Sequence, residues 1–482
     1  MPSGQTGFFA PSGECIQYGC ALRFYSGCHK GPEIQAGQYG ACREAGNCIR
    51  PNAAGPTKAG MVFKTGPDTL KKERMLLLSA LNERGELIML TERFTRLNLQ
   101  QLKTSHTFYC RDCRDPLILK IGSHVTPHFS HYRHSTCATF SEPESPMHLQ
   151  GKKDLFLWLR GQGLDVSLEQ YFPSIRQRAD LVVRKYRQLF AIEYQCSPIP
   201  FGRLMERTAG YRRLGILPVW ILGGMPFRSP GKEAERVYRC SDFQLSFLRH
   251  TRHHFYLFSY APGKRKVCLL SHMMPVSAKT FRACYAEKPL SAFSFPFTDD
   301  QFSLVSAPVP LPEWFAERRR WIGLKIQFGK AFQDPFLRHV YEAGMHPVSL
   351  PPFIGLPLLH MAACKQHPVE WQFYVWLDAL FALRTNAAVS LDELLRLFTV
   401  RMEKKEIEFR KSPYVRERNA AKAMIYEYAQ LLVQLGLWSK GKAGYHMNKN
   451  VFAPKNTEEL EHMERHLSSA LRAGVSNGKA EQ

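Results

Sequence analysis

The chain has 482 residues, which is enough for about three domains that each bury a core of their own. With 44% hydrophobic and 12% aromatic residues, the composition is that of a globular protein and excludes wholesale disorder. Lys and Arg (65) outnumber Asp and Glu (42), so the net charge is +23 and polyanions such as nucleic acids are natural partners. A basic protein without such a partner stays open, because charge reports function only indirectly.

The sequence predicts a cytoplasmic protein without a membrane span. A membrane-spanning helix needs roughly 18 apolar residues, and even the apolar stretch 217–227 is interrupted by Pro218, Gly223, Gly224 and Pro226. The first residues show neither a basic start nor the apolar segment of a secretory signal, so we expect the protein to stay in the cytoplasm.

Residues 1–74 are expected to be a poorly structured extension. Five of the 13 cysteines and 11 of the 33 glycines fall within the first 60 residues, in a segment without helical or strand periodicity. In a reducing cytoplasm these cysteines would stay unbridged. We expect ordered structure to begin near Met75.

Residues 75–140 are predicted to hold a hairpin and a zinc-ribbon-like module. Two strand-like runs flank a turn that contains Gly85. Further on, Cys110 and Cys113 form one couple of ligands and His128 and His131 form another, with an apolar strand at 116–120 between them. Two close couples joined by a strand are what tetrahedral Zn²⁺ requires, so the four residues are a candidate structural zinc site.

The histidine couple leaves the fourth zinc ligand open. Two intervening residues are fewer than the usual three to five, so His134 or Cys137 is an alternative fourth ligand. A pair of buried thiols beside surface histidines is the alternative without a metal.

Residues 141–225 are predicted to form an αβββαβ unit. Ser145 caps and Pro146 opens a helix that ends at Gly161 and Gly163. The following elements are strands at 166–169, 178–183 and 189–195, a helix near 201–214 and a strand at 217–222.

Residues 226–482 are expected to be basic and mostly helical, which makes the chain a multidomain α/β (α+β) protein. A capping box at Ser390 and Glu393 begins one helix, and two more follow at 420–437 and 460–471. The basic clusters 318–320, 404–405 and 410–411 can bind phosphates, although such runs are usually solvated faces.

The predicted hairpin of the second and third strands brings two acids together. If its turn is centred between Tyr186 and Arg187, Asp180 lies opposite Glu193, and Gln195 points to the same face. Opposed like charges destabilise a sheet unless something binds between them, so removing one acid should stabilise the metal-free protein. A divalent cation, Mg²⁺ or Mn²⁺, is the simplest such partner.

Two further acids, Glu169 and Glu144, are positioned to complete this acidic set. The alternative is that Asp180 and Glu193 are ordinary strand-edge charges paired with Arg178 or Arg184. Against it, Glu193 interrupts an otherwise apolar strand, where an unpaired charge is costly.

This arrangement resembles the restriction-endonuclease-like fold of the PD-(D/E)XK nuclease superfamily and, more narrowly, the competence protein CoiA family. The likeness spans about residues 75–222 and extends more loosely over the helical remainder. The segments that carry it are Ala80–Glu86, Phe108–Cys113, His128–His131, Glu144–Lys152, Arg178–Asp180 and Ala191–Ser197.

The resemblance implies a protein of natural transformation that acts on incoming single-stranded DNA or on its recombination. Asp180 and Glu193 match the metal-binding acids, while Glu169, Glu144 and His148 are further candidates for the catalytic site. Gln195 takes the place of the superfamily's lysine, and an amide can only orient a water by hydrogen bonds.

Two functions follow from this departure. In the first, the acidic site is expected to cleave DNA with Mg²⁺ or Mn²⁺. In the second, the protein is expected to hold single-stranded DNA, a recombination protein or a DNA-uptake protein without cleaving DNA.

Overall fold

The computed structural model describes much of the chain between Leu76 and Asn477. Residues 1–75, which include the expected extension, lie outside the described part. Further segments outside it are 91–93, 124, 133–134, 136, 138–144, 225–226, 228–235, 252–253, 303–310, 332, 449–452 and 478–482.

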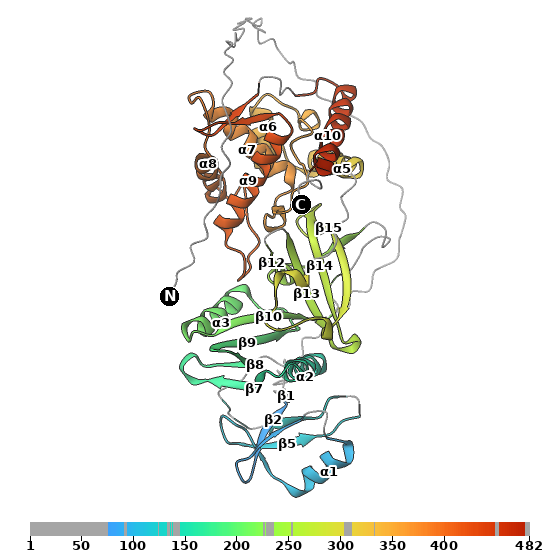
Figure 1. The fold of residues 1–482 in the computed structure, drawn as a ribbon, viewed down its shortest axis with the longest axis vertical. Helices are drawn as coiled ribbons and strands as arrows, with labels where there is room; N and C mark the ends of the chain where they lie inside the picture. The colour runs from blue at the N-terminus through green and yellow to red at the C-terminus, as the bar shows by residue number, and fades with distance from the viewer. Residues whose placement is uncertain are drawn as a thin grey trace, which may run out of the picture. The chain divides into compact units, whose positions relative to one another are not determined.

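The first described element is a six-stranded sheet with one helix, α1 (Arg96–Ser105) (Figure 1). The predicted hairpin is confirmed: Ala80 pairs with Ile88, and Gly85 adopts a positive φ of 77° in the turn. The predicted strand at 116–120 is confirmed as well. The strands are β1 (Leu76–Leu77), β2 (Ser79–Asn82), β3 (Leu87–Met89), β4 (Phe108–Tyr109), β5 (Pro116–Lys120) and β6 (His128–His131).

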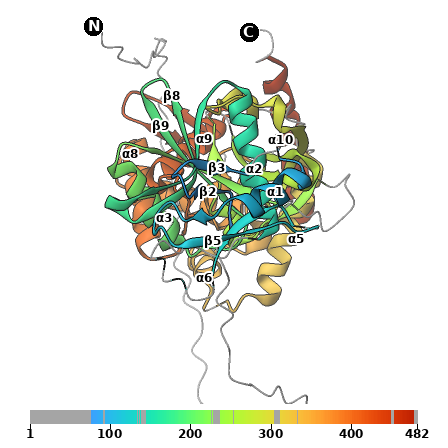
Figure 2. The ribbon, with the colours of Figure 1, turned by 90° about the horizontal axis from the view of Figure 1, so that it is seen from below.

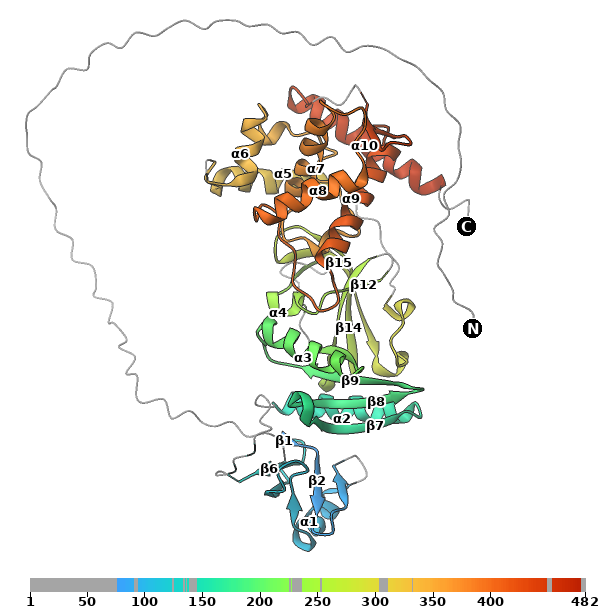
Figure 3. The same ribbon diagram turned by 90° about the vertical axis from the view of Figure 1, so that its left-hand side faces the viewer.

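The next elements follow the αβββαβ order that the sequence predicts. The Ser145 hydroxyl accepts from the His148 amide and so caps α2. Strands β7, β8 and β9 are successive antiparallel neighbours (Figure 3). Strand β10 pairs in parallel with β9 (Figure 1). The bounds are α2 (Pro146–Gly161), β7 (Asp165–Phe172), β8 (Gln177–Lys185), β9 (Gln188–Gln195), α3 (Phe201–Arg213) and β10 (Leu217–Gly223).

Helices α2 and α3 cover different faces of this sheet. Leu181 and Ile192 pack with α2 in one hydrophobic cluster. Val182 and Ala191 alternate with them along the strands and pack with Tyr211 of α3 in another.

The sheet continues beyond β10, which corrects the expectation of a mostly helical chain from residue 226. Strand β10 pairs in parallel with β13 at Leu222 and Ser259, and β14 and β15 follow as antiparallel neighbours. The whole is a nine-stranded sheet. Its added elements are β11 (Val237–Arg239), α4 (Asp242–Leu245), β12 (Arg249–His250), β13 (Phe255–Ala261), β14 (Lys266–Pro275) and β15 (Thr280–Pro289).

The expected helical region begins only at Leu311. Its elements are α5 (Leu311–Phe328), α6 (Pro335–Glu342), α7 (Pro368–Ala382), α8 (Leu391–Glu403), α9 (Glu417–Gln434), the hairpin β16 (Trp438–Lys440) and β17 (Tyr445–Met447), and α10 (Thr457–Asn477). Two arginines of the predicted basic clusters are buried here. Arg318 donates to the carbonyls of Leu350, Pro351 and Ile354, and Arg410 donates to the carbonyls of Ala362 and Ala278. These two side chains hold loops together and are not available to phosphates.

Candidate functional site

Asp180 and Glu193 lie where strands β8 and β9 separate. The two strands lie side by side as a hairpin (Figure 2). The predicted register is confirmed from Lys185 and Gln188 at the turn to Leu181 and Ile192, and the two acids are the next residues on each strand. Beyond that pair, the Tyr194 amide donates to Oδ2 of Asp180 at 2.9 Å. A carboxylate thus replaces a main-chain carbonyl as acceptor at the open end of the hairpin.

The carboxylate of Asp180 contacts two basic side chains of α2. Nε2 of His148 is 3.2 Å from its Oδ2, and Nζ of Lys152 is 4.0 Å from its Oδ1. Burial opposes ionisation of Asp180, but His148, Lys152 and the Tyr194 amide together hold its pKa well below the usual range. The side chains of α2 thus favour the ionised form of Asp180.

Glu193 is held by two residues of α3. Arg207 and the Tyr211 hydroxyl both donate to its Oε1. Burial raises the pKa of Glu193, and the charge of Asp180 adds to this, although Arg207 and Tyr211 counteract both. The partners of the two acids thus come from helices on different faces of the sheet. The sequence alone shows no such partners for the two carboxylates and leaves only a cation between them.

An amine does lie beside Asp180, although Gln195 stands where the nuclease superfamily has its lysine. The Gln195 amide donates to the Ser197 carbonyl at 2.9 Å. The amine beside Asp180 is instead that of Lys152, whose side chain is 0% exposed. Its position four residues after His148, on the same helix face, was the signal for it in the sequence.

Glu169 binds the N-terminal sheet. It adopts a left-handed φ of 51° in β7, and its carboxylate accepts from the Leu78 and Ser79 amides and from the Ser79 hydroxyl. Lys152 donates to it at 2.8 Å. Glu169 is thus an anchor between two sheets, and Glu144 lies outside the described residues.

Three thiols and one imidazole form a tight cluster at the end of the six-stranded sheet. The ligand atoms of Cys110, Cys113, His131 and Cys137 all lie within 4.8 Å of one another. Sγ of Cys113 is 3.4 Å from Nε2 of His131. Ligands of a tetrahedral zinc ion with Zn–S bonds of 2.3 Å are about 3.8 Å apart, so the cluster has the dimensions of a metal site.

Cys137 takes the place predicted for His128. The His128 ring is directed to the Thr126 carbonyl, 2.9 Å from its Nδ1. His128 and His131 are three residues apart in strand β6, and side chains at that spacing point to opposite faces. His134, the other alternative, lies outside the described residues.

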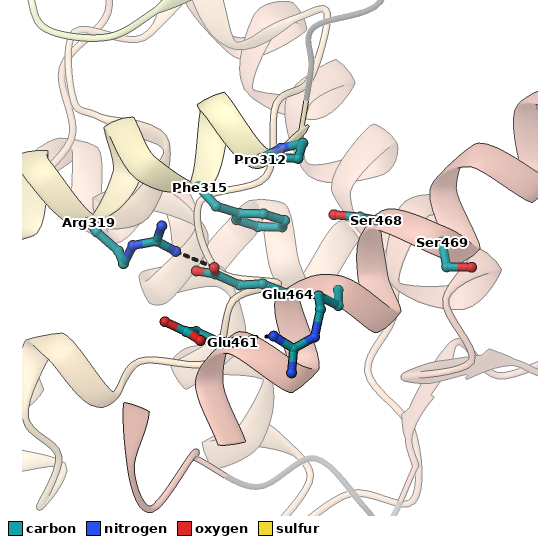
Figure 4. A pocket seen from close by; sticks show the side chains of 8 residues that line it. Pro312, Phe315, Arg319, Glu461, Glu464, Ser468 and Ser469 are labelled. Atoms are coloured by element: carbon teal, nitrogen blue, oxygen red, sulfur yellow. Dashed lines mark hydrogen bonds and ion pairs between the residues drawn. The ribbon is translucent and has the colours of Figure 1, made fainter. Parts of the chain in front are cut away.

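A pocket of about 430 Å³ lies elsewhere, between α5 and α10 (Figure 4). Arg319 and the buried Glu464 form an ion pair in it, which joins the two helices. The lining residues are Pro312, Phe315, Arg319, Glu461, Glu464, Arg465, Ser468 and Ser469. It has no contact with either acid or with the cysteine cluster.

Comparison with protein families finds three successive matches along the chain. Residues 91–140 match the competence protein CoiA N-terminal domain, residues 144–298 its nuclease-like domain, and residues 309–461 its C-terminal domain. The chain belongs to the competence protein CoiA family. Competence protein CoiA of Bacillus subtilis (strain 168) is 28% identical over 315 residues, 64% of this chain and 82% of that protein. No solved structure matches the chain.

The family match places both clusters in named domains. Cys110, Cys113, His131 and Cys137 lie in the CoiA N-terminal domain, and Asp180 and Glu193 lie in the nuclease-like domain. The nuclease-like match runs to residue 298 and so includes β11–β15. Among the described residues, no helix is long and apolar enough to cross a membrane.

Proposed function

We propose that this protein acts on DNA in natural transformation, in the cytoplasm, through a restriction-endonuclease-like core in which Asp180 and Glu193 hold Mg²⁺ or Mn²⁺. The observation that carries the proposal is the position of the two acids at the open end of the β8–β9 hairpin. The bonds to Asp180 from His148 and Tyr194 end on Oδ2, and both bonds to Glu193 end on Oε1. Oδ1 and Oε2 are hard oxygen donors that suit either cation.

The side chains around the acids have separate tasks in cleavage. A bound divalent cation would supply activation of water and stabilisation of the phosphodiester charge. Lys152 and His148 keep Asp180 ionised. Lys152 supplies the positive charge that Gln195 cannot.

A second candidate function is DNA binding without cleavage. Arg207 already neutralises Glu193, so a cation must compete with a partly buried guanidinium for this carboxylate. In this candidate function the protein holds single-stranded DNA for recombination or DNA-uptake proteins.

Cleavage of DNA by the purified protein should require Mg²⁺ or Mn²⁺ and fall about 100-fold or more in Asp180→Asn and in Glu193→Gln, because each variant loses a charged ligand. Gel assays of labelled single-stranded DNA measure this. Asp300→Asn is the control, since Asp300 is an exposed acid outside strands β8 and β9. Full cleavage by Glu193→Gln would exclude this site, whereas DNA binding without any cleavage would favour the second function.

The tip of the β8–β9 hairpin is the DNA contact that we propose for either function. Tyr186 is 89% exposed and adopts a left-handed φ of 55°, which is rare for a bulky residue. Exposed Arg184 and Arg187 flank it. The Gln188 side chain donates to the Gly215 carbonyl, which brings the arginine-rich end of α3 to the same end of the sheet. Exposed aromatics among basic side chains suit single-stranded nucleic acid.

Binding of single-stranded DNA should weaken as salt rises, and Arg187→Ala should reduce the logarithmic salt slope by about 0.7. Tyr186→Ala should cost about 1–3 kcal/mol of binding free energy through the loss of one base stack. Fluorescence anisotropy over a salt series measures both. Arg160→Ala, at the exposed end of α2, is the control. If Arg187→Ala and Arg160→Ala show the same logarithmic salt slope, the hairpin tip does not contact DNA.

For the cysteine cluster we propose structural Zn²⁺, because three thiols and an imidazole are the ligands that this ion prefers. Elemental analysis should find about one zinc per chain, falling sharply in Cys137→Ser and unchanged in His128→Ala. This pair of variants separates the two ligand sets. Zinc lost from His128→Ala but kept in Cys137→Ser would restore the set predicted from the sequence.

A further inference from the structure

We propose that the metal-binding turn Cys110–Cys113 positions the nuclease-like site through a buried ion pair of Asp112 with Arg178. The inference rests on the proposed function of Asp180. It makes Asp112 a positioning residue, and it makes cation affinity at Asp180 depend on the metal state of the cysteine cluster.

The turn reaches the nuclease-like sheet through both of its middle residues. Asp112 lies between the two cysteine ligands, and its carboxylate pairs with Arg178 of β8. The two side chains are only 12% and 7% exposed. Arg111 donates from Nη1 to the Leu168 carbonyl of β7 at 2.7 Å. A metal bound to Cys110 and Cys113 would therefore fix the positions of Arg111 and Asp112, the two residues of the turn that contact β7 and β8.

Arg178 is placed to transmit this constraint to both acids. It lies two residues before Asp180, in a part of β8 that pairs with β7 but lies beyond the last paired residues of β9. Its carbonyl accepts from Arg207 at 3.0 Å, and Arg207 in turn binds Glu193. One residue thus contacts the cysteine turn by its side chain and the Glu193 pair by its main chain.

A parallel connection runs through Glu169. This residue follows Leu168, the acceptor of Arg111, and binds the Leu78 and Ser79 amides of the N-terminal sheet. It also binds Lys152, the amine beside Asp180. The N-terminal sheet therefore holds Lys152 in place through Glu169, and it holds strand β8, which carries Asp180, through Arg178.

The test uses the full-length, zinc-loaded protein and Mn²⁺, whose free ion is counted by its electron paramagnetic resonance signal. Mn²⁺ binds thiolate sites weakly compared with Zn²⁺, so it reports on the carboxylates. Asp112→Asn should weaken Mn²⁺ binding about 10- to 100-fold, as loss of an outer-shell partner does, with zinc content unchanged. Asp112→Glu keeps the carboxylate and should restore most of the affinity. Cys137→Ser, which removes a zinc ligand and leaves Asp112 and Arg178 in place, should weaken Mn²⁺ binding together with zinc loss.

Two comparisons keep the outcomes separate. Asp180→Ala must abolish Mn²⁺ binding; if it does not, the proposed function of this site fails. If Asp180→Ala abolishes binding while Asp112→Asn and Cys137→Ser both bind Mn²⁺ as the parent does, the coupling is overturned. The exchange Asp112→Arg with Arg178→Asp covers the case in which Asp112→Asn does not fold, because it retains the pair. Parent-like affinity in the exchange supports the coupling, and affinity as low as that of a single variant contradicts it.

Discussion

Replacing Lys152 by methionine is expected to lower the free energy of unfolding by about 3–5 kcal/mol, the cost of breaking a buried ion pair from one side. The amine is fully buried, donates to Glu169 and lies near Asp180. Without it, two carboxylates share the same interior with one counter-charge fewer. Urea unfolding followed by circular dichroism measures the change.

Lys153→Met is the matched control, because the neighbouring lysine is only half-buried and should change stability by no more than about 0.5 kcal/mol. The double variant Lys152→Met with Glu169→Gln should recover part of the loss, since it removes both charges of the pair. Equal stability of Lys152→Met and Lys153→Met would show that the amine does not hold this network.

Glu193→Ala is expected to destabilise the metal-free protein, again by about 3–5 kcal/mol. The sequence argument predicts the opposite, because it counts only the repulsion from Asp180. The structure adds the partly buried Arg207 and the buried Tyr211, whose guanidinium and hydroxyl would both lose the Glu193 carboxylate as acceptor.

Thermal melts in the presence of a chelator distinguish the two expectations. The pair Glu193→Ala with Arg207→Met should recover much of the stability, because no unpaired charge remains. A single variant that melts at or above the parent temperature would show that repulsion between the acids outweighs the pair with Arg207.

The local parts of the fold are predictable from the sequence because short turns fix them. A two-residue turn at Tyr186 and Arg187 sets the β8–β9 register, and Ser145 with Pro146 sets the start of α2. The strands between 237 and 289 are harder to predict. Two of them, β11 and β12, have only three and two residues, and β13 is buried at all seven positions, so it shows no alternation.

The acids of the candidate site are predictable, but their partners are not. Asp180 and Glu193 are related by a hairpin, whereas His148 reaches Asp180 across 32 residues of sequence. The packing of α2 and α3 on the sheet decides that Lys152 lies beside Asp180 and that Arg207 binds Glu193. That His128 and His131 do not share a cluster is predictable from the sequence, because side chains three residues apart on a strand point to opposite faces of the sheet.

Because β10 pairs with β13, a shortened protein that keeps β10 also needs β13. Trp220, Ile221 and Leu222 are buried in β10, between β9 and β13. A protein that ended at residue 225 would turn this inner strand into an apolar edge with unpaired main-chain groups, open to pairing with another molecule. The expected result is aggregation, so the nuclease-like region should be produced for biochemistry with β13–β15 attached.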